Sequence, residues 1–102
     1  MTYEEYVETV LCVVERIPPG RVMSYGAIAA YLAAQSGRAS PRLVGAILAR
    51  YGGGVPWHRV VTSAGRLPPG HEAEARRRLA AEGVTFRDGR VDIRAHRWWP
   101  VP

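Results

Sequence analysis

The chain has 102 residues, 47% of them apolar and 23% charged, so it is long enough for one small domain with a modest hydrophobic core. No apolar run approaches the ~20 residues that a membrane-spanning helix needs. The acidic start MTYEEYVE lacks the positive charge and the apolar stretch of a signal peptide. We therefore expect a cytoplasmic protein that makes no contact with a membrane.

The chain is strongly basic, with a formal net charge of +5, and all fourteen of its basic residues are arginines. Because guanidinium groups bind phosphates through paired hydrogen bonds and stack on bases, this composition favours a polyanionic partner. A GC-rich genome also enriches arginine over lysine, so composition alone leaves both explanations open.

The cysteine and histidine content argues against a metal site. Cys12 is the only cysteine, so no internal disulfide can form, and we expect it to be a half-buried small side chain beside the apolar stripe of a helix. The three histidines are scattered, and no cluster has the spacing of metal ligands. The sequence therefore predicts neither a metal nor a cofactor.

Capping signals and apolar periodicity predict helices in the first half of the chain. Thr2 and Glu5 form a capping box before the first helix, and Ser24 and Ser40 are N-caps for the next two. The three predicted helices run from about Tyr3 to Ile17, Tyr25 to Ala34 and Pro41 to Tyr51. The polar loop between the second and third, residues 35–40, makes the pair resemble a DNA-binding helix-turn-helix, a pattern that many other helical pairs share.

The second half of the chain predicts smaller elements. They are a short strand from Arg59 to Thr62, a helix from His71 to Glu82 with the arginine triplet Arg76–Arg78 on its solvated face, and a hairpin whose strands Val84–Phe86 and Val91–Ile93 flank residues 87–90. The hairpin is typical of a wing. The tail residues Trp98 and Trp99 are expected to pack against some part of the protein, because two exposed indoles would be unfavourable. The predicted fold is mainly α with small β elements, a winged helix-turn-helix domain.

The segment GGGVPWHRVV, Gly52 to Val61, is the most unusual part of the sequence. Three glycines free the backbone, Pro56 restricts it again, and Trp57 and His58 follow. Taken alone, the pair fits either a buried tryptophan with a hydrogen-bonded histidine or a pocket with a stacking surface.

Pro56 to Val60 resembles the Pro-Cys-His-Arg-Val active site of the O6-alkylguanine-DNA alkyltransferases, with Trp57 where that family has its nucleophilic cysteine. This replacement is typical of the alkyltransferase-like proteins, which bind O6-alkylguanine without repairing it. Three further motifs match in the same order: Gly20 to Tyr25 as Gly-x-Val-x-Ser-Tyr, Arg42 to Gly45 as Arg-x-Val-Gly, and Glu82-Gly83. The resemblance covers nearly the whole chain and implies one domain, residues 1–102, like the C-terminal domain of the alkyltransferases.

The resemblance implies two DNA-binding residues. Arg42 matches an arginine that enters the base stack and fills the place of a flipped nucleotide, although a helix-turn-helix arginine at this position also fits a phosphate contact. Tyr25 matches a tyrosine that contacts the 3′ phosphate, although it also fits a core aromatic with a bonded hydroxyl.

The resemblance also implies a lesion pocket formed by Trp57, His58, Arg59, Tyr51 and Arg66. His58 pairs in the family with the matching residue of Glu82, so these two are expected to persist as a polar brace, and Arg59 as a framework hydrogen-bond donor.

The sequence departs from the family around this pocket. Tyr51 lies near the family's asparagine hinge, and the loop Leu67–His71 lacks the tyrosine-serine-glycine pattern that lines the alkyltransferase pocket. Arg66 is the only arginine near the place where some alkyltransferase-like proteins stack one on the damaged base.

The implied function is that of a DNA damage sensor and not of an enzyme. It binds double-stranded DNA containing O6-alkylguanine from the minor groove, flips the nucleotide, and flags it for nucleotide excision repair proteins, with DNA bending as the signal. It is expected to act as a monomer. Two alternatives are an enzyme that uses His58 and Glu82 on the flipped base, and a sequence-specific winged-helix regulator.

Overall fold

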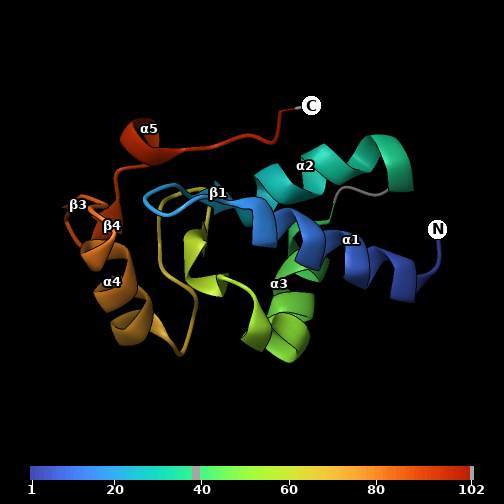
Figure 1. The fold of residues 1–102 in the computed structure, drawn as a ribbon, viewed down its shortest axis with the longest axis horizontal. Helices are drawn as coiled ribbons and strands as arrows, with labels where there is room; N and C mark the ends of the chain where they lie inside the picture. The colour runs from blue at the N-terminus through green and yellow to red at the C-terminus, as the bar shows by residue number, and fades with distance from the viewer. Residues whose placement is uncertain (38–39, 102) are drawn as a thin grey trace.

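Three helices form the N-terminal half of the molecule in a computed structural model that describes residues 1–37 and 40–101 (Figure 1). They are α1 (Tyr3–Arg16), α2 (Tyr25–Ser36) and α3 (Pro41–Tyr51). The predicted N-caps are confirmed, because the side chains of Thr2, Ser24 and Ser40 accept backbone N–H groups of the first turns.

The C-terminal ends of two helices differ from the predicted ends by one or two residues. Ile17 is extended and serves as the C-cap of α1, since Pro18 disfavours helical backbone in the residue before it. Helix α2 continues two residues beyond Ala34, to Ser36. Its C-cap is Gly37, which adopts a left-handed φ of 72°. The loop predicted for residues 35–40 is therefore shorter, and its residues 38 and 39 lie outside the described part of the chain.

The main core lies where α1, α2 and α3 meet. Its fully buried members include Val10 and Val14 from α1, Ile28 and Leu32 from α2, and Val44 and Ile47 from α3. Cys12 is exposed, so the prediction that it is half-buried was wrong. It follows Val10 by two residues, about 200° around the helix, and therefore faces away from the core.

Two short parallel strands join this helical half to the end of the segment Gly52–Val61, which we call the central loop. β1 (Met23–Ser24) pairs with β2 (Val60–Val61), and the sequence predicted no strand at β1. The predicted strand from Arg59 to Thr62 is also corrected, because Arg59 belongs to the 3₁₀ turn η2 (Trp57–Arg59). The glycine run forms another 3₁₀ turn, η1 (Gly52–Gly54).

The C-terminal half packs as a second, smaller cluster around Val22, Val61, Leu79 and Val91. Its elements are α4 (Glu72–Ala81), β3 (Phe86–Arg87), β4 (Arg90–Val91) and α5 (Ile93–His96). In α4, His71 and Glu82 are caps rather than helical residues. The hairpin is confirmed, but its strands are Phe86–Arg87 and Arg90–Val91, so Val84, Thr85 and Asp92 lie outside them. The turn is the two residues Asp88–Gly89, both with positive φ. Ile93 begins a helix, so its assignment to a strand was wrong.

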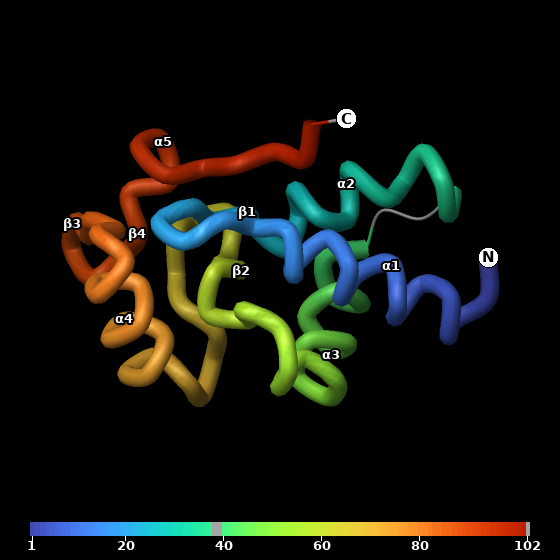
Figure 2. The backbone as a smooth tube through the Cα atoms, in the orientation of Figure 1, coloured from blue at the N-terminus to red at the C-terminus, as the bar shows by residue number. Residues whose placement is uncertain are grey.

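The C-terminal tail runs alongside β1 and back toward α2 (Figure 2). The amide of Trp98 donates to the carbonyl of Val22 at 2.9 Å, and the Trp98 side chain packs on the main core. Trp99 stays 50% exposed with its ring edge-on to Tyr31, so the prediction that both indoles are packed holds only for Trp98. No helix in the described part of the chain is long and apolar enough to span a membrane.

Candidate functional site

A cleft of about 690 Å³ lies between α3 and the segment that connects β2 to α4. Its walls come from the start of α2, one side of α3, the glycine run, the 3₁₀ turn η2 and the connecting segment. The lining residues are Tyr25, Gly26, Pro41, Arg42, Gly45, Leu48, Ala49, Gly52, Gly53, Trp57, Thr62, Ser63, Pro68, Pro69 and His71. These lining residues include one arginine and no carboxylate, so the cleft suits an apolar or aromatic group attached to an anion.

Three of the predicted site residues line this cleft: Tyr25, Arg42 and Trp57. Tyr25 is half-buried, and burial raises the pKa of its phenol, so the hydroxyl stays neutral and able to donate a hydrogen bond. Arg42 is exposed in the first turn of α3 and makes no ion pair or side-chain hydrogen bond within the described residues. Its guanidinium is therefore available to a ligand.

Four residues that were expected in the pocket do not line the cleft. Tyr51 ends α3 and is 41% exposed, with its ring under the guanidinium of Arg50 at 5.4 Å. Arg66 is exposed in the turn at residues 62–66, and His58 and Arg59 are directed into the protein. The assignment of Tyr51, Arg66, His58 and Arg59 to the lesion pocket therefore stays a prediction from the resemblance, and the structure places none of the four in the lining of the cleft.

Sequence reasoning also missed part of the cleft wall. Thr62 and Ser63 line it because β2 ends at Val61 and the chain then turns beside α3. The structure also places Pro68 and Pro69, from the loop Leu67–His71, in the wall. The loop and α3 are far apart in the sequence, so no local pattern shows that they line the same cleft.

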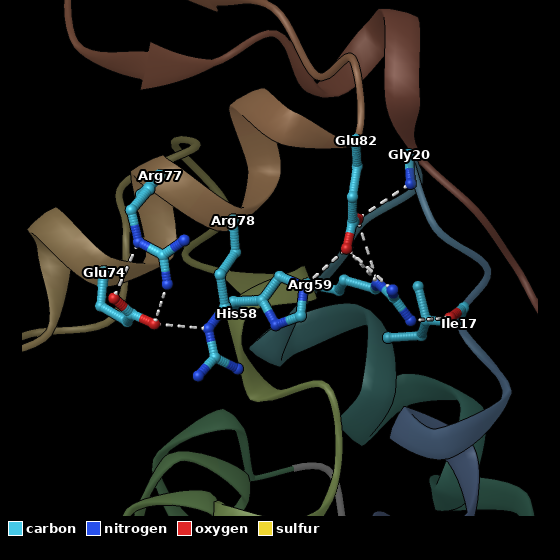
Figure 3. Close-up of polar contacts among 8 residues, drawn as sticks. All are labelled: Ile17, Gly20, His58, Arg59, Glu74, Arg77, Arg78 and Glu82. Atoms are coloured by element: carbon cyan, nitrogen blue, oxygen red, sulfur yellow. Dashed lines mark hydrogen bonds and ion pairs between the residues drawn. The ribbon is translucent and has the colours of Figure 1, made fainter.

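The indole of Trp57 contacts two side chains, one from the N-cap and one from the last turn of α4. The ring of His71 lies edge-on at 5.6 Å, and the guanidinium of Arg78 lies 5.3 Å from the centre of the indole. Arg78 is itself held by the carboxylate of Glu74 at 2.7 Å, as Figure 3 shows. The prediction that the arginine triplet is solvated is confirmed, since all three arginines are exposed, and Arg78 also lies against the Trp57 wall of the cleft.

Glu82 accepts hydrogen bonds from two segments, the 3₁₀ turn η2 and the turn at Gly20 (Figure 3). It accepts from Nε2 of His58 at 2.8 Å, from Nη2 of Arg59 at 2.8 Å and from the amide of Gly20 at 3.0 Å. Arg59 also donates to the carbonyl of Ile17 at 2.9 Å. We call this group the Glu82 brace; it ties the ends of α1 and α4 to η2.

Burial and hydrogen bonding within the Glu82 brace shift the pKa values of Glu82 and His58. Burial raises the pKa of Glu82, but hydrogen bonds from Arg59, Gly20 and His58 outweigh burial and lower the pKa to about 2. Burial lowers the pKa of His58, and the opposing attraction of Glu82 does not overcome it. At neutral pH, His58 is therefore an uncharged imidazole that donates from Nε2 to an ionised carboxylate.

This protonation state leaves Nδ1 of His58 as an unprotonated acceptor. The atom is buried and has no hydrogen-bond partner among the described residues. The residues that the structure describes contain no group of three histidine, cysteine or acidic side chains that could hold a metal.

The comparisons with known proteins agree with this architecture. Residues 5–84 match the family described as 6-O-methylguanine DNA methyltransferase, DNA binding domain. A DNA base-flipping protein of Vibrio parahaemolyticus is 31% identical over 102 residues, covering 95% of this chain and 99% of that protein. A DNA base-flipping protein of Escherichia coli is 37% identical over 100 residues, covering 93% of this chain and 75% of that protein.

Two solved structures are similar along the whole chain. The crystal structure of S. pombe Atl1 in complex with damaged DNA containing O6-carboxymethylguanine matches with a TM-score of 0.82 and 29% identity, over 98% of this chain and 100% of that chain. A structure of S. pombe ATL in complex with DNA matches with a TM-score of 0.77 over the same shares. The chain belongs to the family of the 6-O-methylguanine DNA methyltransferase DNA-binding domain, as an alkyltransferase-like member.

Proposed function

We propose that this protein binds O6-alkylguanine in duplex DNA with the damaged nucleotide flipped into the cleft beside Trp57. The observation that carries the proposal is the cleft itself, which joins an indole wall to Arg42 on α3, an arginine that pairs with none of the described residues. Flipping a guanine out of the stack costs on the order of a few kcal/mol, and a π surface together with a side chain that fills the gap offsets that cost. Tyr25 supplies a neutral hydroxyl for a neighbouring phosphate.

Binding proceeds in this proposal without alkyl transfer, and the protein is not an enzyme. The lining residues include no thiol, and Cys12 lies on the exposed side of α1. Trp57 stands where the resemblance places the family's nucleophile, and an indole lacks the thiolate that accepts an alkyl group. The protein then leaves the lesion intact and marks it, with bent DNA as the signal, for nucleotide excision repair proteins.

The enzyme alternative has little support from the geometry. His58 is only 6% exposed and does not line the cleft, so its free Nδ1 has no direct path to a bound base. We further propose that the protein acts as a monomeric single domain in the cytoplasm, bound to the DNA of the nucleoid.

The test compares the affinity for a duplex with one O6-methylguanine and for the same duplex with guanine, together with the intact mass of the protein. We expect tighter binding of the damaged duplex and an unchanged protein mass. Equal affinity for both duplexes, or preference for one base sequence, would point to the regulator alternative. Loss of the alkyl group from the DNA would point to an enzyme.

A pair of tryptophan variants connects the affinity to the cleft. Trp57→Ala is expected to weaken binding of the damaged duplex by on the order of 10–100-fold, which corresponds to the loss of one base-stacking surface. Trp57→Phe keeps an aromatic face and should retain most of the affinity. Trp99→Ala is the matched control, because Trp99 is exposed and lies outside the cleft.

A further inference from the structure

Three exposed arginines lie at the hairpin end of the molecule. Arg87 and Arg90 lie on β3 and β4, and Arg94 lies on α5. All three are exposed and make no ion pair or side-chain hydrogen bond with any residue that the structure describes. We call them the arginine cluster.

The register of the hairpin sets two of these charges directly against each other. Arg87 is the cross-strand partner of Arg90, and like charges at directly opposed positions destabilise a hairpin. The turn does not require this pair, because the positive φ values of Asp88 and Gly89 determine its geometry. The repulsion between Arg87 and Arg90 therefore lowers the stability of the folded protein, and a bound polyanion would reduce this repulsion.

The arginine cluster surrounds a polar hollow of about 430 Å³. The hollow is lined by Ser63, Ala64, Arg87, Asp88, Arg90, Val91, Asp92, Ile93 and Arg94. Asp88 and Asp92 are the only carboxylates of this lining and pair with none of the three arginines among the described residues. The charge around the hollow is therefore net positive, which favours an anion.

The hollow and the cleft meet at Ser63, which lines both. The hairpin is fixed to this junction, because the amide of Val91 donates to the carbonyl of Gly65 at 2.8 Å. A Cβ on Gly65 would lie 2.5 Å from the carbonyl oxygen of Val91, so the two backbones are in contact. The hairpin is thus attached directly beside the cleft, so a ligand that extends from the cleft past Ser63 reaches the arginine cluster.

We propose that the arginine cluster binds backbone phosphates of the duplex on one side of the nucleotide held in the cleft. This inference rests on the proposed function and deepens it, since it adds a second contact that is independent of the lesion. Phosphate contacts carry no base information, so the cluster strengthens binding to damaged and undamaged DNA alike.

The test uses the double variant Arg87→Gln/Arg90→Gln and measures affinity for both duplexes over a range of salt concentrations. Each phosphate contact contributes about 0.9 to the slope of log affinity against log salt, so the slope should fall by about two, and affinity by the same factor for both duplexes. Arg77→Gln is the control, because Arg77 is exposed but already paired with Glu74 at 2.6 Å. The salt slope of the Arg77→Gln variant should equal that of the wild-type protein.

Removing the opposed charges should also raise the melting temperature by roughly 1–4 °C while DNA affinity falls, which separates lost binding from misfolding. An unchanged slope, or a loss confined to the damaged duplex, would overturn the inference. If the wild-type protein shows no lesion preference, the proposed function fails, but the slope on undamaged DNA still decides this inference. Stabilisation by inorganic phosphate at constant ionic strength, lost in the double variant, would indicate a free-anion site and contradict the assignment to DNA.

Discussion

Nε2 of His58 lies 2.8 Å from Oε2 of Glu82, and this hydrogen bond joins the central loop to the end of α4. His58 is neutral and Glu82 is ionised, so the imidazole donates and its other nitrogen is left as a buried acceptor. The bond therefore positions Trp57, the residue before His58, against the cleft. The strength of this hydrogen bond depends on the negative charge of Glu82, so its contribution to stability can be measured by varying the pH.

We predict that Glu82→Gln lowers the free energy of unfolding by about 3 kcal/mol at neutral pH, the value implied by a pKa lowered from 4.5 to about 2. Because the folded-state pKa lies below the unfolded value, the unfolded chain binds this proton first as pH falls. The contribution of Glu82 is complete above pH 4.5 and is lost between pH 4.5 and about 2. Urea unfolding at a series of pH values measures this loss, which should be smaller in the variant.

Glu74→Gln is the matched control for this prediction. Hydrogen bonds from Arg77 and Arg78 lower the pKa of Glu74 to about 2 as well, but its side chain is 40% exposed and water screens its ion pairs. We expect a much smaller change in stability than for Glu82→Gln. An equal loss in the two variants would contradict a special role for the Glu82 brace.

A second prediction compares two glycines with nearly the same backbone conformation. Gly65 and Gly70 have φ values of 82° and 83°, so alanine at either position carries the strain of left-handed backbone, about 1–2 kcal/mol. At Gly65 the new methyl group also meets the carbonyl oxygen of Val91 at 2.5 Å, whereas at Gly70 nothing lies within 4 Å. Thermal unfolding should therefore show a clearly larger loss for Gly65→Ala than for Gly70→Ala. Equal losses would show that the hairpin separates easily from the turn.

The helical half of the fold was predictable from local signals in the sequence. The side chains of Thr2, Ser24 and Ser40 each satisfy amides at a helix start, so the first residue of each helix is set by its own neighbours. The Asp88–Gly89 turn is equally local, since its two residues tolerate positive φ.

The missed elements depend on contacts between distant segments. β1 exists because Met23 meets Val60, and the hydrogen bond from the amide of Val22 to the carbonyl of His96 holds the start of the tail near β1. Neither contact leaves a periodic pattern of residues in the sequence from which it could be predicted. For the same reason the resemblance identified Trp57 and Arg42, which line the cleft, but Ser63, which joins it to the hairpin, followed only from the structure.

The third prediction concerns Trp57→Cys, which restores the family's Pro-Cys-His-Arg motif. We expect little or no alkyl transfer, because activation of a thiol requires it to lie within hydrogen-bond reach of a base. The substitution also removes the ring that Arg78 and His71 pack against, so the wall of the cleft loses its support. Intact mass after incubation with the damaged duplex measures the transfer. Stoichiometric gain of an alkyl group would show that the free Nδ1 of His58 still reaches the thiol.

The last prediction separates two roles of Arg42. If the guanidinium only binds a phosphate, Arg42→Ala should weaken binding to damaged and undamaged duplexes equally and lower the salt slope by about one. If Arg42 fills the gap left by the flipped guanine, its partner exists only in the extruded complex. We expect this second outcome, because Arg42 pairs with no residue in the described part of the chain and lines the same cleft as Trp57.

Arg42→Ala should then reduce affinity for the damaged duplex preferentially, by on the order of 1–3 kcal/mol, the range of one lost stacking contact. The fluorescence of a 2-aminopurine beside the lesion should fall toward its stacked value in the mutant complex, because the extruded state loses its support. Arg50→Ala is the control from the other end of α3, where the guanidinium lies over Tyr51 and outside the cleft. Equal weakening of both duplexes with unchanged fluorescence would assign Arg42 to the phosphate backbone, since a contact that is present before and after flipping cannot distinguish the lesion from guanine.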